Sequence, residues 1–377
     1  MSEIYKGRGN SAMRADFIDF INYVFGFNGN NEDFLKLLPK LYKEKYLPCE
    51  HNYVVTEDGK LKAAIGVFPR ELDVMGTKLV LHGVGNVAVH PYSRSKGYMR
   101  ELLNRAIEDM IASGADMSDL GGLRQRYGYF SYEVASVVCR LNITPTSLRH
   151  SFAGVGMKPL DFIEVTENSP ALEKIIALHE SKPQHIVRPR EDFLDIAHSW
   201  NRKLWAIYDS ERFVGYFIDR MIELTLCDMA DFNDAVRNFV AKNGSVTLTL
   251  PLFEAAMIEA AWKICDDATY ANDQNFTIFH WAKVIGAFLK LKAAGTVLPD
   301  GEIGYLIHGI AGDERFTVRV RGGIPEVIDG ASANVVELAH KDAVSYFLGL
   351  VSPERMRSGL SAAWYPLGLF IDSADHV

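Results

Sequence analysis

Residues 87–99, VAVHPYSRSKGYM, decide the fold prediction for the first third of the chain. A strand-like apolar run over residues 78–89 ends in this stretch, and an amphipathic helix begins directly after Gly97. Backbone amides at the start of a helix form an anion site, and a glycine there lets a phosphate approach the backbone closely. Arg94 and Lys96 add positive charge to the turn. The stretch therefore predicts a pyrophosphate cradle. The alternative is an ordinary strand–turn–helix with solvated basic side chains.

The same stretch resembles the acyl-CoA motif of the GNAT-family N-acetyltransferases. That family's signature is Arg/Gln-x-x-Gly-x-Gly/Ala, which Arg94 and Gly97 match, whereas Met99 departs from the last small position. The aromatic run 127–130, YGYF, is similar to a stretch late in GNAT domains. The resemblance implies that acetyl-CoA is the co-substrate. It places the cofactor-binding residues at Val87, Ala88, Val89, Arg94, Ser95, Lys96, Gly97 and Tyr98.

The segments before this turn predict helices first and then hairpins of strands. Apolar residues recur at helical spacing over residues 14–26 and 33–45. Pro39 lies inside the second of these ranges, so a kink or two short helices are expected there. A hairpin is expected at Asp58-Gly59, because tight turns favour this dipeptide. The first third is thus expected to be an α+β layered unit.

The middle third repeats this order of elements, although its letters barely repeat, and it resembles a second GNAT fold. At the position of the phosphate turn it has residues 228–234, DMADFND, with neither a glycine nor a basic residue. Its three carboxylates would repel a pyrophosphate. This copy is therefore expected not to bind CoA, and to be structural or to form one wall of a substrate cavity. The expected helices are 171–182, 191–204, 231–241 and 253–265, and the expected strands are a hairpin over 204–220 and the runs 222–228, 245–251 and 276–281.

The last third predicts another α+β segment, which resembles the sterol-carrier-protein type 2 fold. Two GNAT-like units followed by this fold is the layout of the Eis-like (enhanced intracellular survival) N-acetyltransferases, and the resemblance covers essentially the whole chain. It implies a catalytic GNAT domain over 1–148, a degenerate GNAT-like domain over 149–282 and a sterol-carrier-protein-like domain over 283–377. The elements expected in the last third are a helix over 281–295, strands over 300–309, 314–323 and 324–330, and a helix over 334–350.

Composition excludes several classes of protein. The chain has 377 residues, of which 48% are hydrophobic and 23% charged, as is usual for soluble globular proteins of two or three domains. A disordered, fibrous or coiled-coil protein would have another composition. The 40 basic and 48 acidic residues give a net charge of −8, which argues against nonspecific nucleic-acid binding.

The sequence also predicts neither a membrane partner nor a metal. Residues 1–9 contain no apolar signal-peptide core, and no stretch approaches the roughly 18 apolar residues of a membrane span. The four cysteines lack C-x-x-C spacing and the eleven histidines are scattered, so neither a disulfide framework nor a zinc site is indicated. We therefore expect a cytoplasmic protein with reduced thiols.

Acetyl transfer to an amine needs a neutral amine, a polarised thioester carbonyl and a proton for the leaving thiolate. The resemblance implies that backbone amides of Val87 and Val89 polarise the carbonyl and that Tyr129 is the general acid, with Tyr127 and Tyr132 as the nearest alternatives. It also implies that the α-carboxylate of Val377 enters the active site. Because an α-carboxylate has an intrinsic pKa of about 3.3–3.7, it acts as a base, as a base through water, or as an anchor for a cationic amine.

The acceptor is expected to be a small-molecule or peptide amine. Phe25, Phe27 and Phe34 are candidates for lining its pocket, although aromatic residues at helical spacing also occur as core residues. Aminoglycosides, lysine side chains and a homo-oligomer, such as a hexamer, are implied by resemblance alone. The alternative function is a non-catalytic sensor or carrier that binds an acyl-CoA and an apolar ligand.

Overall fold

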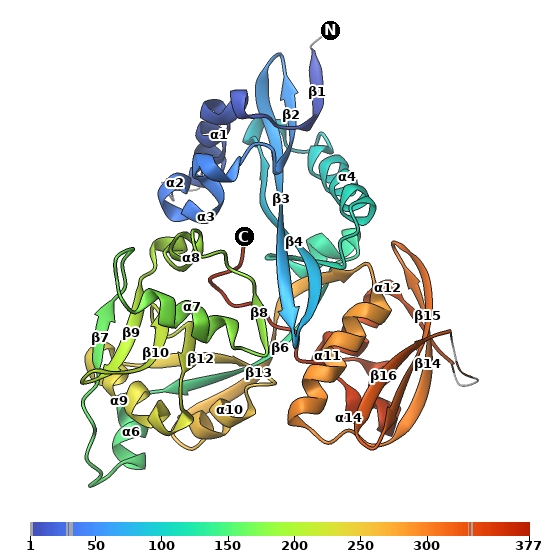
Figure 1. The fold of residues 1–377 in the computed structure, drawn as a ribbon. Helices are drawn as coiled ribbons and strands as arrows, with labels where there is room; N and C mark the ends of the chain where they lie inside the picture. Colours follow the sequence, from blue (N-terminus) through green and yellow to red (C-terminus); the bar gives the residue numbers. More distant parts are fainter. Residues whose placement is uncertain (1–2, 28, 30–32, 331, 333–334) are drawn as a thin grey trace.

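The computed structural model describes residues 3–377 except 28, 30–32, 331 and 333–334. Two long strands, β3 (Lys60–Val74) and β4 (Thr77–Val89), pair antiparallel and run down the middle of the molecule (Figure 1). The turn between them, Met75-Gly76, has φ angles of 52° and 81°, as a two-residue turn that matches the twist of the strands requires. The apolar run that predicts a strand over 78–89 thus forms β4.

These two strands belong to a nine-stranded sheet whose order mixes distant parts of the sequence. β4 pairs in parallel with β5 (Met117–Leu120), and β13 (Asp267–Ile278) pairs antiparallel with both β5 and β6 (Glu133–Ile143). A strand from the middle third therefore lies between two strands of the first third. The other members are β1 (Ile4–Arg8) beside β2 (Asn52–Glu57), β2 beside β3, β8 (Gln184–Ile186) beside β3, and β12 (Val246–Pro251) beside β6.

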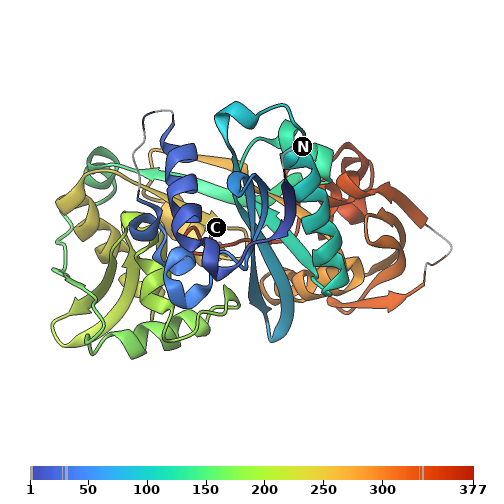
Figure 2. The same cartoon turned by 90° about the horizontal axis from the view of Figure 1, so that it is seen from above.

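Helices flank the strands β3 and β4 on opposite sides, as the two views in Figures 1 and 2 show. α1 (Arg14–Gly26) lies on one side and α4 (Tyr98–Ala112) on the other. The expected interruption at Pro39 is confirmed, because α2 (Phe34–Leu37) ends before it and α3 (Pro39–Tyr42) begins with it. The hairpin expected at Asp58-Gly59 joins β2 to β3, with φ angles of 48° and 73°.

Two four-stranded sheets form the rest of the molecule. One has the order β11 (Glu223–Leu226), β10 (Arg212–Ile218), β9 (Leu204–Asp209) and β7 (Asp161–Glu164), and the other has the order β16 (Ile324–Asp329), β15 (Gly312–Arg321), β14 (Gly301–Gly309) and β17 (Val335–Ala339). The remaining α-helices are α5 (Arg124–Tyr127), α6 (Pro145–Ser151), α7 (Leu172–Glu180), α8 (Phe193–Ala197), α9 (Phe232–Asn243), α10 (Ala255–Trp262), α11 (Trp281–Gly295), α12 (His340–Leu348), α13 (Pro353–Met356) and α14 (Gly359–Trp364). The α+β prediction is confirmed. Within the described ranges, each helix is too short or too polar to cross a membrane.

The helix predicted over 191–204 is wrong in length. Only α8 and the single 3-10 turn η5 (Ser199–Asn201) form there, and Leu204 already belongs to β9. Trp200 and Asn201 have φ angles of 65° and 56°. An α-helix cannot continue through this left-handed backbone, so the segment ends in a tight turn.

Two predictions near the end of the chain also misplace a boundary between a strand and a helix. The strand predicted over 276–281 begins at Asp267 instead, because the polar, half-exposed residues before Phe276 give no apolar run. The helix predicted over 334–350 begins only at His340. Before it, β17 pairs in parallel with β14, in keeping with the strand preference of its β-branched residues. Residue 334 lies outside the described residues.

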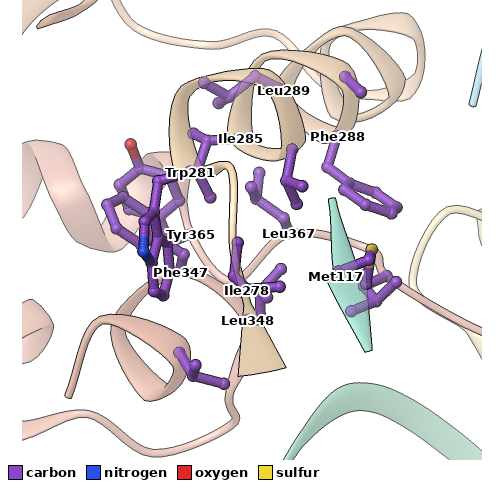
Figure 3. Close-up of a cluster of buried hydrophobic side chains, with 14 of the residues drawn as sticks. Met117, Ile278, Trp281, Ile285, Phe288, Leu289, Phe347, Leu348, Tyr365 and Leu367 are labelled. Atoms are coloured by element: carbon purple, nitrogen blue, oxygen red, sulfur yellow. The ribbon is translucent and has the colours of Figure 1, made fainter. Parts of the chain in front are cut away.

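One hydrophobic cluster joins the last third of the chain to the large sheet (Figure 3). Trp281, Ile285 and Phe288 of α11 belong to the same buried cluster as Met117 of β5 and Ile278 of β13. Burial of such side chains contributes about 1.5–3 kcal/mol each. The cluster therefore makes the packing of α11 part of the stability of the sheet.

Replacing Phe276 should test how strongly the sheet depends on β13. Its side chain is fully buried, so Phe276→Ala is expected to lower the free energy of unfolding by about 3–5 kcal/mol. Tyr270→Ala, on the same strand but 56% exposed, should change it by less than about 0.5 kcal/mol. Urea unfolding measures both values, and equal losses would contradict the assigned position of Phe276 in the core.

Candidate active site

A β-bulge interrupts β4 close to its end. Ala64 of β3 pairs with Ala88, whereas Gly66 pairs with Gly85, so β4 contains one extra residue at this point. Asn86 within the bulge has a φ angle of 52°, and its Oδ1 is buried without a hydrogen bond among the described residues. Bulges often lie next to active sites, where they redirect the strand.

β4 also separates from β5 at the same level. The two strands pair only from Leu81 to Val84 on β4, so residues 85–89 have no β5 partner. Val87 and Val89 are half-buried and Ala88 is buried, as the sequence predicts for strand residues. The backbone amides of this segment that face β5 are therefore available to a ligand. This observation fits an acyl-thioester held by main-chain hydrogen bonds.

The turn after β4 ends in a helix start without a side-chain cap. Gly97 has a φ angle of 82° and precedes α4, whose N-cap position supplies no side chain that could accept a hydrogen bond from the first amides. Arg94, Ser95 and Lys96 are exposed at this turn, and Tyr98 is buried. Uncapped amides at a helix start, together with exposed cations, suit a phosphate group.

One carboxylate competes for the positive charge of the turn. The Glu57 Oε1 atom lies 2.7 Å from Lys96 Nζ and also accepts a hydrogen bond from the Tyr98 hydroxyl. A bound pyrophosphate would have to draw Lys96 away from Glu57. Arg94 has no ion pair within the described part of the chain, so it is the cation best placed to meet an anion.

Val377 lies directly on β4, beside the bulge. A Cβ atom at Gly85 would lie 3.0 Å from the main-chain carbonyl carbon of Val377, and one at Gly83 would lie 2.6 Å from Val377 Cγ2. A side chain at Gly85 would displace the Val377 main chain, and one at Gly83 would displace the side chains of Val377 and Arg70. These two glycines are not among the predicted site residues, although two glycines on one face of a strand indicate a close backbone approach.

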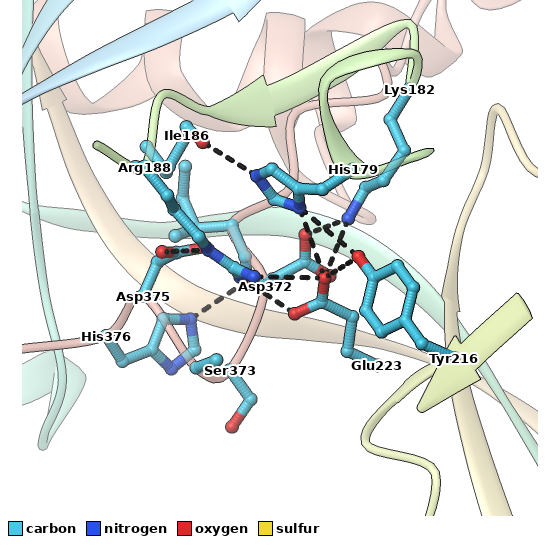
Figure 4. Close-up of polar contacts among 12 residues, drawn as sticks. His179, Lys182, Ile186, Arg188, Tyr216, Glu223, Asp372, Ser373, Asp375 and His376 are labelled. Atoms are coloured by element: carbon cyan, nitrogen blue, oxygen red, sulfur yellow. Dashed lines mark hydrogen bonds and ion pairs between the residues drawn. The ribbon is translucent and has the colours of Figure 1, made fainter. Parts of the chain in front are cut away.

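Arg188 holds the segment that leads to Val377 (Figure 4). Its Nε and Nη2 atoms donate to Asp375 Oδ1 and Oδ2 at 2.9 and 2.7 Å, and Nη2 also donates to Glu223 Oε2 at 2.7 Å. Lys182 Nζ adds further ion pairs to the cluster, at 2.5 Å from Asp372 Oδ2 and 3.3 Å from Glu223 Oε1. All these groups are buried or nearly so, and breaking a buried pair costs about 3–5 kcal/mol.

Further side chains hold the main chain of the same segment. Lys40 donates to the carbonyl oxygen of His376 at 2.6 Å, and Arg70 donates to that of Asp375 at 2.6 Å. Arg70 also pairs with the buried carboxylate of Asp119 at the end of β5. Other contacts are Lys40 with the Ala374 carbonyl, Gln184 with the Phe370 carbonyl and Arg202 with the Ser373 carbonyl. No local sequence pattern indicates this set of contacts, because its members are far apart along the chain.

Burial and charge shift the pKa values of this cluster. Burial lowers the pKa of Lys40 to about 7, although Asp375 opposes the shift. Burial alone would raise the pKa of Asp375, but Arg188 outweighs it and holds that pKa below its usual value. Burial likewise lowers the pKa of His376 to about 4. The segment is therefore bound at neutral pH through an ionised Asp375 and a neutral His376.

Two cavities meet at Val377, which lines both of them. The Arg70 cavity, of about 560 Å³, is lined by Lys40, Leu41, Lys45, Tyr46, Leu47, His51, Phe68, Pro69, Arg70, Glu71, Ile186, Val187, Pro189, Asp192, Ile196, Asp375 and Val377. The Asp273 cavity, of about 480 Å³, is lined by Gly121, Trp200, Ile222, Thr247, Thr249, Asp273, Gln274, Phe370, Ser373, His376 and Val377. Both volumes lie within the range of small-molecule sites.

The three candidate tyrosines differ strongly in exposure. Tyr129 lies in the 3-10 turn η4 (Gly128–Phe130) and is 89% exposed, whereas Tyr127 is 6% exposed. Tyr132 is fully buried, and its hydroxyl is hydrogen-bonded to Ser118 Oγ at 2.7 Å. Of the three tyrosines, Tyr129 alone is accessible from solvent and could therefore contact a bound ligand.

The three candidate phenylalanines do not line either of these cavities. Phe34 is buried and packs against Phe25 with ring centroids 5.0 Å apart. Phe25 and Phe27 are about two-fifths exposed, at 40% and 44%. Phe34 belongs to the hydrophobic cluster against which the Val377 side chain packs. Phe34 is therefore connected to Val377 through the hydrophobic core and does not line either cavity.

The carboxylates of residues 228–234, which the sequence analysis compares with the turn after β4, have protein partners. Asp231 forms two hydrogen bonds with Arg212, at 2.7 and 2.8 Å, and Asp228 accepts a hydrogen bond from the Ala230 amide. The Asp228 carboxylate thus takes up an amide hydrogen at the start of this turn. In the described residues, no cluster of histidine, cysteine or acidic side chains has the arrangement of a metal site.

The comparisons with known proteins agree with this geometry. Residues 9–135 match the family model described as "Acetyltransferase (GNAT) domain". Residues 9–135 are therefore similar to a GNAT acetyltransferase domain. This domain spans the bulge, the phosphate turn and Tyr129, and the prediction of an enzyme of the N-acetyltransferase class is confirmed. No curated protein matches the sequence.

Solved structures share the fold over the whole length of the chain at low identity. A probable N-acyltransferase from Enterococcus faecalis has a TM-score of 0.71 and 14% identity, with 100% of each chain covered. A GCN5-related N-acetyltransferase from Anabaena variabilis has a TM-score of 0.66 and 15% identity, with 98% of each chain covered. Eis1 from Mycobacterium abscessus has a TM-score of 0.60 and 14% identity, over 99% of this chain and 100% of that one. At identities of 14–15%, these similarities show a shared fold alone.

Arg94 offers a direct test of the phosphate turn. Arg94→Ala is expected to weaken CoA binding about tenfold or more, because a hydrogen bond to a charged group contributes about 1.5–3 kcal/mol. Arg100→Ala, an exposed arginine further along α4, is the matched control and should change affinity little. Asp228→Ala should also leave CoA affinity unchanged. Calorimetric titration with CoA measures all three, and equal losses for both arginines would contradict a specific turn.

Asp375 offers a test of the buried ion pairs. Asp375→Asn is expected to lower the free energy of unfolding at pH 7 by about 3 kcal/mol. Because the folded state depresses the pKa of Asp375, the stabilisation is present above the unfolded pKa of about 3.9 and is lost as the pH falls below it. The difference between wild type and variant should therefore be constant from about pH 5 to 8 and shrink below about pH 4.

Urea unfolding across this pH range measures the difference. The matched control is Asp313→Asn, because the Asp313 side chain is 59% exposed and should contribute less than about 0.5 kcal/mol. A difference for Asp375→Asn that grows toward acid pH would contradict the assigned ionisation state.

Proposed function

We propose that the protein transfers the acetyl group of acetyl-CoA to a primary amine by direct transfer. The observation that carries the proposal is the meeting of three features at one place: the bulged end of β4, its separation from β5, and Val377 against Gly83 and Gly85. A GNAT domain that only bound its cofactor would not need an ordered chain segment at the bulge.

In the proposed reaction the amine nitrogen attacks the thioester carbonyl. A C–N bond forms and the C–S bond breaks, the amine loses one proton, and the thiolate of CoA gains one. Backbone amides of Val87 and Val89 polarise the carbonyl, and the Tyr129 hydroxyl protonates the thiolate. The carboxylate of Val377 receives the amine proton, directly or through water, or anchors the cationic amine. The exposure of Tyr129 and the position of Val377 support these roles.

The cofactor is proposed to bind with its pyrophosphate at the uncapped start of α4. Arg94, Ser95 and Gly97 meet the phosphates, and Lys96 joins them by leaving Glu57. Ala88 and Tyr98 support this segment from the buried side. The uncapped amides and the unpaired edge of β4 fit such a ligand.

The Asp273 cavity is the proposed entrance for the acceptor amine. Asp273 is the one acidic side chain in its lining, and its Oδ1 atom accepts a hydrogen bond from Arg140 Nη2 at 2.9 Å, whereas burial lowers the pKa of His376 to about 4. The carboxylates of Asp273 and Val377 favour a cationic group in this cavity, and the net charge of −8 agrees with a cationic acceptor. We propose a small-molecule or peptide amine, of which aminoglycosides and lysine side chains are examples.

The domain organisation is proposed as a catalytic unit over 1–148, a degenerate GNAT-like unit over 149–282 and a sterol-carrier-protein-like unit over 283–377. The separate four-stranded sheets of the second and third units support this division, although β8, β12 and β13 belong to the large sheet. The four cysteines are free thiols, which supports a cytoplasmic location. A homo-oligomer is proposed by resemblance to the Eis-like enzymes.

Thiol release from acetyl-CoA across a panel of amines tests the function. Wild type is expected to release CoA in the presence of an accepted amine, and Tyr129→Phe should lower kcat by about 100-fold or more. Tyr5→Phe, another exposed tyrosine of the first third, is the matched control. A chain without residues 376–377 should lose activity by a similar factor while its CoA affinity stays unchanged.

The outcomes separate the two functions. If acetyl-CoA binds but no amine accelerates thiol release, the protein is the non-catalytic sensor or carrier. If Tyr129→Phe and the shortened chain both keep full activity, the assigned catalytic residues are wrong. The pH profile of the shortened chain separates the two roles of Val377, because loss of a base removes the acid limb of kcat, whereas loss of an anchor raises KM.

A further inference from the structure

A third cavity lies away from Val377, where α11 faces the loop after β12. It has a volume of about 390 Å³ and is lined by apolar side chains, among them Leu252, Phe253 and Leu291, and by Pro366. It shares no lining residue with the Arg70 and Asp273 cavities. Its size lies within the range of pockets that bury a small molecule.

The cavity contains one charged side chain, Lys292 of α11. Its Nζ atom donates to the carbonyl oxygen of Pro366 at 3.1 Å, and no carboxylate of the described residues lies within 4.0 Å of it. Burial lowers the pKa of Lys292 to about 8, so the side chain still carries its charge at neutral pH. A partly buried lysine in apolar surroundings is normally paired with an anion.

Arg355, outside the cavity lining, has a charge of the same sign as Lys292. Arg355 repels the ammonium group of Lys292 and contributes to the lowered pKa. The Arg355 guanidinium is itself satisfied by main-chain carbonyl oxygens, at 2.8 Å from those of Gly349 and Leu350. Two cations thus lie near this cavity, and an anion that entered it would meet a positive field.

We propose that this cavity binds a single-chain amphiphile with one carboxylate, such as a medium-chain fatty acid. The carboxylate pairs with Lys292, and the apolar chain lies against Leu252, Phe253 and Leu291. A hydrophilic anion would leave the apolar walls unfilled, whereas an uncharged chain would leave the ammonium group unpaired. The combination of one cation with apolar walls selects a ligand that has both parts.

Binding of decanoate, decanol and decylamine to the full chain tests the proposal by calorimetric titration without acetyl-CoA. Decanoate is expected to bind at least about tenfold more tightly than decanol, and decylamine should not bind, since a charge-assisted hydrogen bond contributes such a factor. Lys292→Met should reduce decanoate affinity about tenfold and leave decanol affinity unchanged. Lys290→Met is the matched control, because Lys290 is exposed on the same helix.

Several results would overturn the proposal. Equal affinities for decanoate and decanol, or an unchanged decanoate affinity in Lys292→Met, would remove the role of the ammonium group. Full competition by acetate would identify a small-anion site instead. Sedimentation with phosphatidylglycerol vesicles that depends on Lys292 would identify a membrane lipid. If Lys292→Met does not fold, Lys292→Gln and Phe253→Ala replace it, and both should weaken decanoate binding.

Discussion

The paired contact of Arg188 with Asp375 and Glu223 is the interaction on which the candidate active site depends. The guanidinium group of Arg188 and the two carboxylates are all buried. Their geometry is fixed, because a shift of any one of them would break a buried ion pair. Asp375 lies two residues before Val377. The ion pairs therefore determine where the last residue meets β4, although none of the three charged groups belongs to the GNAT motif.

The segment 374–377, which contacts β4, is bound by residues from the first and middle thirds of the chain. Lys40 and Arg70 come from the first third, Arg188 and Glu223 from the middle third, and the segment itself from the last. In the proposed reaction the cofactor and the acceptor must be held together, because misplacement of reacting groups by about 1 Å can cost a factor of about 100 in rate. A buried network of this extent supplies the necessary rigidity.

Much of the fold could be predicted from the sequence, and the site only in part. The hairpin at Asp58-Gly59 and the interruption of the helix at Pro39 follow from the conformational preferences of these residues, and both are present. The start of β13 was missed because its first residues are polar and half-exposed, so that no apolar period marks them. Tyr129 and Arg94 were predicted as site residues from the resemblance of their stretches to the GNAT family. Lys40, Arg70 and Arg188 carry no such signal, because the main-chain and side-chain groups that they bind are between 187 and 336 residues away and only the folded chain brings them near.

The position of β13 between β5 and β6 has a consequence for how the molecule forms. Until residues 267–278 leave the ribosome, the edges of β5 and β6 that face β13 have no partner, and the sheet around residues 9–135 is incomplete. Unpaired edges in a partly folded chain favour association with other chains. Contacts across more than a hundred residues also slow folding. The nascent protein is thus expected to rely on chaperones through the synthesis of its middle third.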